Sequence, residues 1–242
     1  MVQHIGIVGC SAEGAALCYR TVCLEGEQLL GAYQHPEVSV HTHPLGEYMR
    51  HVSCDDWAGV AQLMLSSAHK LAGAGADFLI CPDNTIHRAL PAVLARSPRP
   101  WLHIAEVVAG VAAARGYRTL GITGTRYLVE SEVYPQKLRA RGLAYLRPSD
   151  AECAEVNRII FEELVRGVCS AAAVTYLRGV FTRLQAAGAD AIVLGCTELP
   201  LIMSDANSPL PTLDSTRLLA RAALARAAGK PEVASGGRRG AS

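Results

Sequence analysis

The stretch Gly75-Ala-Asp-Phe-Leu-Ile-Cys-Pro-Asp83 decides the fold, because it aligns without a gap on Gly188-Ala-Asp-Ala-Ile-Val-Leu-Gly-Cys196. Both stretches enter an apolar run through Gly-Ala-Asp and leave it through polar residues, which is typical of a buried parallel strand. The alignment places Asp83 and Cys196 at the same position after two equivalent strands. Ligand-binding residues of α/β proteins gather at such strand-to-helix turns. These two residues are therefore the first candidates for a functional site.

A second internal similarity links the starts of the two halves. His4-Ile-Gly-Ile-Val-Gly-Cys10 resembles Thr119-Leu-Gly-Ile-Thr-Gly-Thr125, so each half opens with a strand and a glycine turn. We predict strands at 78–81, 101–103, 120–123, 143–146 and 191–194, and helices at 55–72, 85–95, 105–115, 129–141, 151–168, from there again to 187, and 215–228. This alternation predicts an α/β fold with two pseudo-symmetric lobes, each a mainly parallel sheet flanked by helices, and a site in the cleft between them.

Prolines mark the places where the chain is expected to cross between the lobes, near 97–100 and 209–211. We predict a first lobe of residues 1–99 plus 213–229 and a second lobe of residues 100–212. The last helix would then return to the first lobe. The tail at 230–242 lacks apolar periodicity and is predicted to be disordered.

Composition excludes several classes of protein. The chain has 242 residues, of which 50% are hydrophobic, and a formal net charge of +1. Such a balance provides no basic surface for nucleic acid or for a membrane. No apolar run approaches the roughly 20 residues of a membrane helix, so we expect a cytoplasmic protein. The eight cysteines form no CxxC pair, and His41-Thr-His43 lacks accompanying acidic ligands, so we expect no metal site.

Cys196 is followed by Thr197 and Glu198 at the predicted start of a helix. A helix N-terminus favours the thiolate, so a cysteine of ordinary pKa, about 8.5, could act there as a base or nucleophile at neutral pH. A buried core cysteine is the alternative. The repeat and the polar neighbours favour the functional interpretation, and Glu198 could orient Cys196 or accept its proton.

The chain resembles the aspartate/glutamate racemase superfamily of pyridoxal-phosphate-independent racemases and epimerases. The resemblance reaches from the first strand to about Ala228. It lies in segments 5–9, 73–77, 84–87, 103–106, 121–125 and 195–201. The most specific part is Asn84-Thr85 combined with Gly195-Cys-Thr-Glu198. Gly124-Thr-Arg-Tyr127 is most similar to the broad-specificity amino-acid racemase branch.

In that family two cysteines flank the substrate Cα, and one removes the α-proton while the other returns a proton to the opposite face. The resemblance implies a small amino acid or related carboxylate as substrate, no cofactor and a homodimer. It also implies that polar groups hold the substrate, namely Ser11, Asn84, Thr85, Thr125, Tyr127, Thr197 and Glu198. Helix capping is the alternative role for Asn84 and Thr197. Arg50 or Arg126 could meet a side-chain carboxylate of the substrate.

The chain departs from the family pattern at Asp83, which stands where the first cysteine precedes Asn-Thr. A shifted loop could instead bring Cys81 into that position. Two-way racemisation needs one proton shared by the pair, and a carboxyl of ordinary pKa, about 3.9, is a poor acid at neutral pH. Burial and a nearby thiolate would raise that pKa. Asp83 and Cys196 could then act as the two catalytic groups.

Three hypotheses follow. The primary one is a cofactor-independent racemase or epimerase that uses Cys196 and Asp83. The second is a decarboxylase or lyase of the arylmalonate-decarboxylase type, in which Cys196 alone carries the proton and Tyr127 lies near the carboxylate site. The third is a weakly active or purely binding homologue, in which Asp83 pairs with the substrate ammonium.

Overall fold

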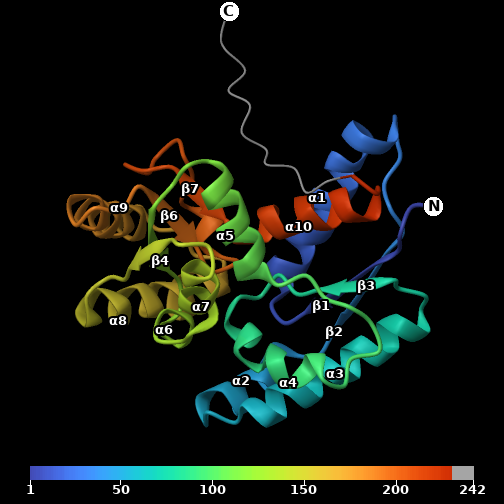
Figure 1. The fold of residues 1–242 in the computed structure, drawn as a ribbon. Helices are drawn as coiled ribbons and strands as arrows, with labels where there is room; N and C mark the ends of the chain where they lie inside the picture. Colours follow the sequence, from blue (N-terminus) through green and yellow to red (C-terminus); the bar gives the residue numbers. More distant parts are fainter. Residues whose placement is uncertain (231–242) are drawn as a thin grey trace, which may run out of the picture.

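The computed structural model describes residues 1–230 and contains two parallel β-sheets (Figure 1). The sheets have the orders β2-β1-β3 and β5-β4-β6-β7, and every strand pair is parallel. The strands are β1 (Ile5–Gly9), β2 (Val38–Thr42), β3 (Phe78–Ile80), β4 (Thr119–Thr123), β5 (Ala144–Leu146), β6 (Ala191–Leu194) and β7 (Thr212–Asp214). The predicted α/β fold is confirmed, because β1 beside β3 is matched by β4 beside β6. Of the predicted tail, 231–242 lies outside the described residues.

Helices flank both sheets. The α-helices are α1 (Ala12–Leu30), α2 (Leu45–Ser53), α3 (Trp57–Gly73), α4 (Leu90–Leu94), α5 (Ile104–Ala114), α6 (Arg126–Val129), α7 (Val133–Arg139), α8 (Asp150–Arg158), α9 (Ala171–Ala186) and α10 (Ser215–Ala227). Shorter segments are the 3-10 helices η1 (Thr85–Ala89), η3 (Leu164–Arg166) and η4 (Leu199–Leu201), and the π-helix η2 (Ile159–Glu163). Within residues 1–230, no helix is both long enough and apolar enough to cross a membrane.

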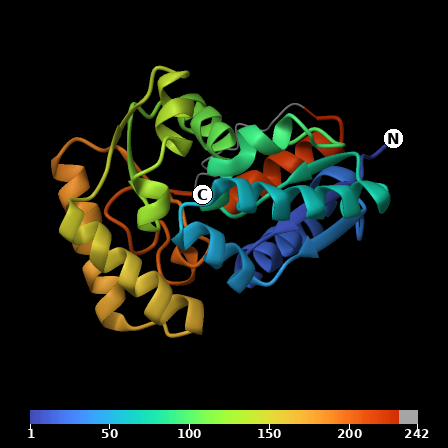
Figure 2. The same ribbon diagram turned by 90° about the horizontal axis from the view of Figure 1, so that it is seen from below.

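Two helices tie the halves together. The chain leaves the first sheet beside β3, where Leu79 forms a parallel bridge with Trp101, and enters α5, which packs on α7. It leaves the second sheet through β7 and enters α10, which returns to pack on α1 (Figures 1 and 2). Since α5 and α10 also contact each other, side chains of both halves share one buried cluster. The lobe boundaries at 99 and 213 stay a prediction.

Three predicted segments differ from the structure. The strand expected at 101–103 is reduced to the Trp101 bridge, because His103 already caps α5 by accepting the Ala105 N–H. The helix expected at 129–141 begins only at Val133, as α7, and Val129 instead ends α6, because the Ser131 hydroxyl donates to the Leu128 carbonyl and accepts the Val133 N–H. The first of the two helical stretches expected between 151 and 187 changes after α8 into the π-helix η2 and the 3-10 helix η3, and the left-handed Gly167 (φ 76°) separates it from the second, α9, close to the expected division at 168.

The first half also contains elements that the predicted segments omit, namely α1, β2 and α2. The sequence signal for α1 is nevertheless present. Ser11 accepts the Gly14 N–H as an N-cap, and the buried residues Ala15, Cys18 and Val22 recur at helical spacing. This helix starts directly after β1, so its first turn lies at the edge of the sheet where β3 also ends.

Candidate active site

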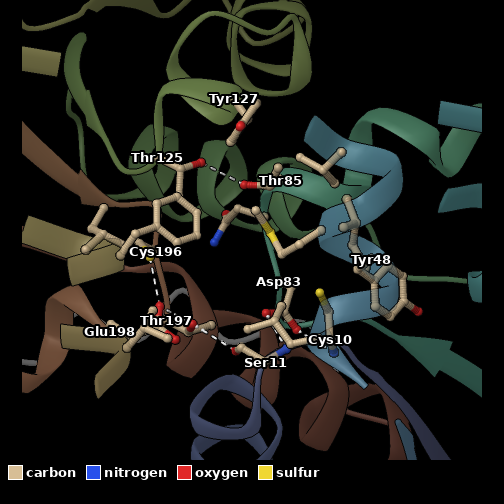
Figure 3. A pocket seen from close by; sticks show the side chains of 18 of the residues that line it. Cys10, Ser11, Tyr48, Asp83, Thr85, Thr125, Tyr127, Cys196, Thr197 and Glu198 are labelled. Atoms are coloured by element: carbon tan, nitrogen blue, oxygen red, sulfur yellow. Dashed lines mark hydrogen bonds between the residues drawn. The ribbon is translucent and has the colours of Figure 1, made fainter. Parts of the chain in front are cut away.

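A pocket lies between the two halves, at the carboxyl ends of β1, β3, β4 and β6 (Figure 3). Its volume is about 70 Å³, on a measure by which one water molecule needs roughly 10–15 Å³. A neighbouring hollow of about 450 Å³ shares part of its lining. All nine sequence-predicted site residues line the pocket: Ser11, Asp83, Asn84, Thr85, Thr125, Tyr127, Cys196, Thr197 and Glu198. Tertiary structure thus brings together residues from four strand ends.

Asp83 is buried and bound by the β1–α1 turn. Its Oδ2 accepts the Cys10 N–H at 3.0 Å, and its Oδ1 accepts the Ser11 N–H at 3.0 Å. Burial, supported by the charge of Glu198, raises the pKa of Asp83 to about 6, although hydrogen bonds from Ser11 and Cys10 act in the opposite direction. The carboxyl can therefore gain or lose a proton near neutral pH, as the sequence analysis required of an acid and base at this position.

Cys196 is paired with a carboxylate and is not activated by a helix. Its Sγ donates to Oε2 of Glu198 at 2.9 Å. The predicted helix after Cys196 is only the three-residue η4, so the expected thiolate stabilisation by a helix N-terminus is wrong. Burial raises the pKa of Cys196, and the negative charge of Glu198 raises it further. The group therefore rests as a thiol that is hydrogen-bonded to the Glu198 carboxylate.

A chain of hydroxyl groups connects the two halves beneath the pocket. Ser11 Oγ lies 3.0 Å from Thr197 Oγ1, which donates to Glu198 Oε2 at 2.7 Å. The close contact between Thr197 and the start of α1 requires a glycine at position 14, because a Cβ there would lie 2.4 Å from Thr197 Cγ2. The arrangement fixes Thr197 and Glu198 relative to the turn that holds Asp83.

Asn84 is part of a second connection between the halves. Its Nδ2 donates to Ser215 Oγ at 2.9 Å, and its Oδ1 accepts from the Tyr134 hydroxyl at 2.7 Å. The Ser215 hydroxyl in turn donates to the Leu194 carbonyl at the end of β6. The alternative role of Asn84 as a helix cap is wrong, because its side chain makes no capping hydrogen bond. The three buried side chains hold Asn84 at the pocket wall.

Thr85 and Thr125 meet across the pocket, with their hydroxyl oxygens 2.9 Å apart (Figure 3). Thr125 also caps α6 by accepting the Leu128 N–H. Tyr127, on the first turn of α6, lines the pocket with its ring, and the Arg126 guanidinium lies over that ring at 5.0 Å. The site residues that cap helices are thus Thr125 and Ser11, whereas the Thr197 hydroxyl donates to Glu198.

Several sequence expectations are not supported. Cys81 does not line the pocket; its Sγ is buried in the first-half core and donates to the Asp83 carbonyl at 3.8 Å. Arg50 and Arg126 are also absent from the lining. Among residues 1–230, no group of three or more His, Cys, Asp or Glu side chains is arranged to hold a metal ion.

Sequence reasoning missed two features of the pocket. Cys10, at the end of β1, lines it beside Asp83 (Figure 3). The second feature is an apolar wall that comes from α2, η1, η2 and η3, made of Leu45, Met49, Val52, Ile86, Ile160, Phe161 and Val165. The sequence did contain a signal for Cys10, because the similarity between the two strand segments ends at Cys10 in one half and at the site residue Thr125 in the other. The sequence contained no such signal for the apolar wall, because segments that are not neighbours in the chain form it.

A sequence model of the Asp/Glu/hydantoin racemase family matches residues 8–223, and the chain belongs to this family. It is 23% identical over 202 residues to the broad-specificity amino-acid racemase RacX of Bacillus subtilis, covering 81% of this chain and 85% of that protein. It is 31% identical over 146 residues to a glutamate racemase of Koribacter versatilis, and the match covers 59% of this chain and 49% of that protein. The chain therefore spans about half the length of that relative.

Among solved structures, the fold is similar to that of a candidate Asp/Glu racemase from Yersinia pestis. The TM-score is 0.85 and the sequence identity 30%, and the match covers 93% of this chain and 99% of that chain. The shared fold thus extends over nearly the whole of both chains.

Proposed function

We propose that the protein is a cofactor-independent racemase or epimerase of an α-amino acid with an uncharged side chain. One observation carries the proposal: a thiol paired with a carboxylate, Cys196 with Glu198, faces the buried Asp83 across one pocket (Figure 3). Two proton-carrying groups on either side of a bound Cα are what racemisation without a cofactor requires. Family membership supports the same class of reaction.

The polar part of the pocket suits the amino-acid head group. Removal of an α-proton places negative charge on the α-carboxylate, so the site must stabilise an enediolate with oriented donors. The hydroxyl groups of Thr85 and Thr125 and the amide of Asn84 stand at the pocket wall for this purpose. In the proposed reaction, Cys196 gives a proton to one face of Cα while the Asp83 side removes one from the other.

The apolar part of the pocket suits the substrate side chain. Within residues 1–230, no lysine, arginine or histidine lines the pocket, whereas Asp83 and Glu198 both do. A side-chain carboxylate of aspartate or glutamate would find no cation here and would be repelled by these two groups. Apolar side chains from α2 and η2 would instead contact an aliphatic substrate.

The test is α-proton exchange in deuterated water over both enantiomers of alanine, leucine, methionine, aspartate and glutamate. We expect deuterium in both enantiomers of an uncharged amino acid, and Cys196→Ala should reduce the exchange by about 10²–10⁴-fold. Cys153→Ala, which removes a buried thiol outside the pocket, is the matched control. Exchange into no amino acid would refute the proposed reaction, and fastest exchange of aspartate or glutamate would refute the substrate class.

One observation favours a second candidate, a single-cysteine decarboxylase. Both oxygens of Asp83 already accept backbone N–H groups, which turns the carboxyl toward the β1–α1 turn. If only Cys196 delivers protons, the protein would release carbon dioxide from a disubstituted malonate. Cys196→Ala would abolish the activity, and the wild type would not convert either amino-acid enantiomer into the other. Release that survives Cys196→Ala would rule this candidate out.

A further inference from the structure

We propose that Cys10 is the group that contacts the substrate Cα on the Asp83 side, and that Asp83 acts as its proton partner, so that each half supplies one thiol with one carboxylate. The inference rests on the proposed racemase function and refines it. It explains how a first-half site without the usual cysteine can perform proton transfer at carbon.

Cys10 occupies the position that this role requires. It follows β1 directly, lines the pocket and also lines the adjoining hollow. Its backbone N–H donates to Asp83 Oδ2, which fixes the residue next to the carboxyl. In Figure 3 the Cys10 sulfur stands beside Asp83, on the side of the pocket away from Cys196. Among the described residues, no hydrogen bond engages the Cys10 sulfur.

Asp83 is less suited to touch Cα itself. Its two oxygens bind the N–H groups of Cys10 and Ser11 at 3.0 Å, so the carboxyl is turned toward the β1–α1 turn. These bonds position it as Glu198 is positioned in the other half by the Thr197 hydroxyl. Each carboxyl is thus anchored by neighbours and lies close to one pocket cysteine.

The electrostatic surroundings of the two thiols also correspond. Burial raises the pKa of Cys10 and the charge of Asp83 raises it further, while burial and then Glu198 act in the same way on Cys196. Both sulfurs therefore rest protonated. Each can act as a base only when its neighbouring carboxylate takes up the thiol proton, which is a role that Asp83 can fill near neutral pH.

The proton balance closes with one proton shared by the two carboxyl groups. Starting with Glu198 ionised and Asp83 protonated, the Cα–H bond breaks and its proton goes to Cys196 Sγ while the Cys196 thiol proton moves to Glu198, to which it is already hydrogen-bonded. The electron pair is held on the substrate as an enediolate. Cys10 then gives its proton to the opposite face of Cα and takes the proton of Asp83. The net change is the transfer of one proton from Asp83 to Glu198, and the reverse reaction restores the start.

The test compares Cys10→Ala and Cys10→Ser with the wild type by deuterium exchange into each enantiomer of leucine and of methionine. We expect either substitution to reduce exchange from one enantiomer by about 10²-fold or more and to leave the other within about tenfold. Cys196→Ala should show the mirror-image loss. A purely structural role of Cys10 would slow both enantiomers equally. Cys18→Ala, in a buried position of α1 outside the pocket, is the control for loss of a thiol.

The outcomes separate this inference from the proposed function. Cys10 variants that racemise in both directions within about threefold of the wild type would overturn the inference and leave Asp83 as the group at Cα. Equal loss from both enantiomers, with the circular dichroism spectrum and melting temperature of the wild type, would also overturn it. A wild type that exchanges neither enantiomer of any amino acid in the larger panel would overturn the proposed function and this inference together.

Discussion

The burial of Asp83 should be measurable as a pH-dependent difference in stability between the wild type and Asp83→Asn. The carboxyl has an ordinary pKa of 3.8, and burial raises its pKa to about 6 in the folded protein. At about 1.4 kcal/mol for each pH unit, this difference corresponds to roughly 3 kcal/mol. The folded protein binds the Asp83 proton more tightly than the unfolded chain does. The contribution of Asp83 is therefore most favourable below about pH 4, falls as pH rises to about 6, and is constant above that.

Asparagine cannot ionise, so its contribution does not change over this range. Its amide oxygen can accept only one of the N–H groups of Cys10 and Ser11, and the other loses its partner, which costs about 1–3 kcal/mol at every pH. Asp83→Asn should therefore be the less stable protein at pH 4. Between pH 4 and pH 7, it should gain roughly 3 kcal/mol relative to the wild type.

Urea unfolding at pH 4, 5, 6, 7 and 8, with linear extrapolation to water, measures the difference at each pH. Asp77→Asn is the matched control, because Asp77 is exposed and its carboxylate accepts a backbone N–H, that of His4. A stability difference between Asp83→Asn and the wild type that stays constant from pH 4 to pH 8 would refute the reasoning. A relative gain of the variant as pH falls would do the same, and a pH-dependent difference of equal size in the control would show that burial is not the cause.

Two further substitutions test the connections between the halves. Tyr134→Phe leaves the buried Oδ1 of Asn84 without its hydroxyl partner. The substitution should therefore lower the free energy of unfolding, measured by urea titration, by about 1–3 kcal/mol. An unchanged urea midpoint would contradict the hydrogen bond between Tyr134 and Asn84. Gly14→Ala places a Cβ 2.4 Å from Thr197 Cγ2 and should lower the free energy of unfolding by about 1–3 kcal/mol. Gly46→Ala, which has open space around the added Cβ, is the control and should not lower it. Equal melting temperatures of the two variants would disprove the close contact between position 14 and Thr197.

Sequence predicted the arrangement of the sheets better than the lengths of the helices. The Gly-Ala-Asp repeat identified β3 and β6, and the starts of the two halves identified β1 and β4, because apolar runs of four or five residues record burial on both faces of a strand. Helix ends depended on single side-chain bonds. The Ser131 hydroxyl, for example, separates α6 from α7, so the helix predicted to start at 129 begins only at Val133.

The candidate site divides in the same way. Motif positions can be matched from the order of residues alone. The sequence was therefore sufficient to name Asp83, Asn84, Thr85, Cys196, Thr197 and Glu198. The role of each depends on its neighbours in space. The expected activation of Cys196 by a helix was wrong because the following segment is only η4, and the actual partner is the carboxylate two residues later.

The sequence by itself therefore determined that two similar halves each end a buried strand at the site, with Asp83 in one half at the position of Cys196 in the other. Those facts follow from local hydrophobic pattern and residue order. Only the tertiary structure decided that Asp83 is bound by the β1–α1 turn, that Cys10 stands next to it, and that apolar walls without a cation line the described pocket. Partners from elements more than 70 residues apart meet through packing, and no single segment of the chain records that packing.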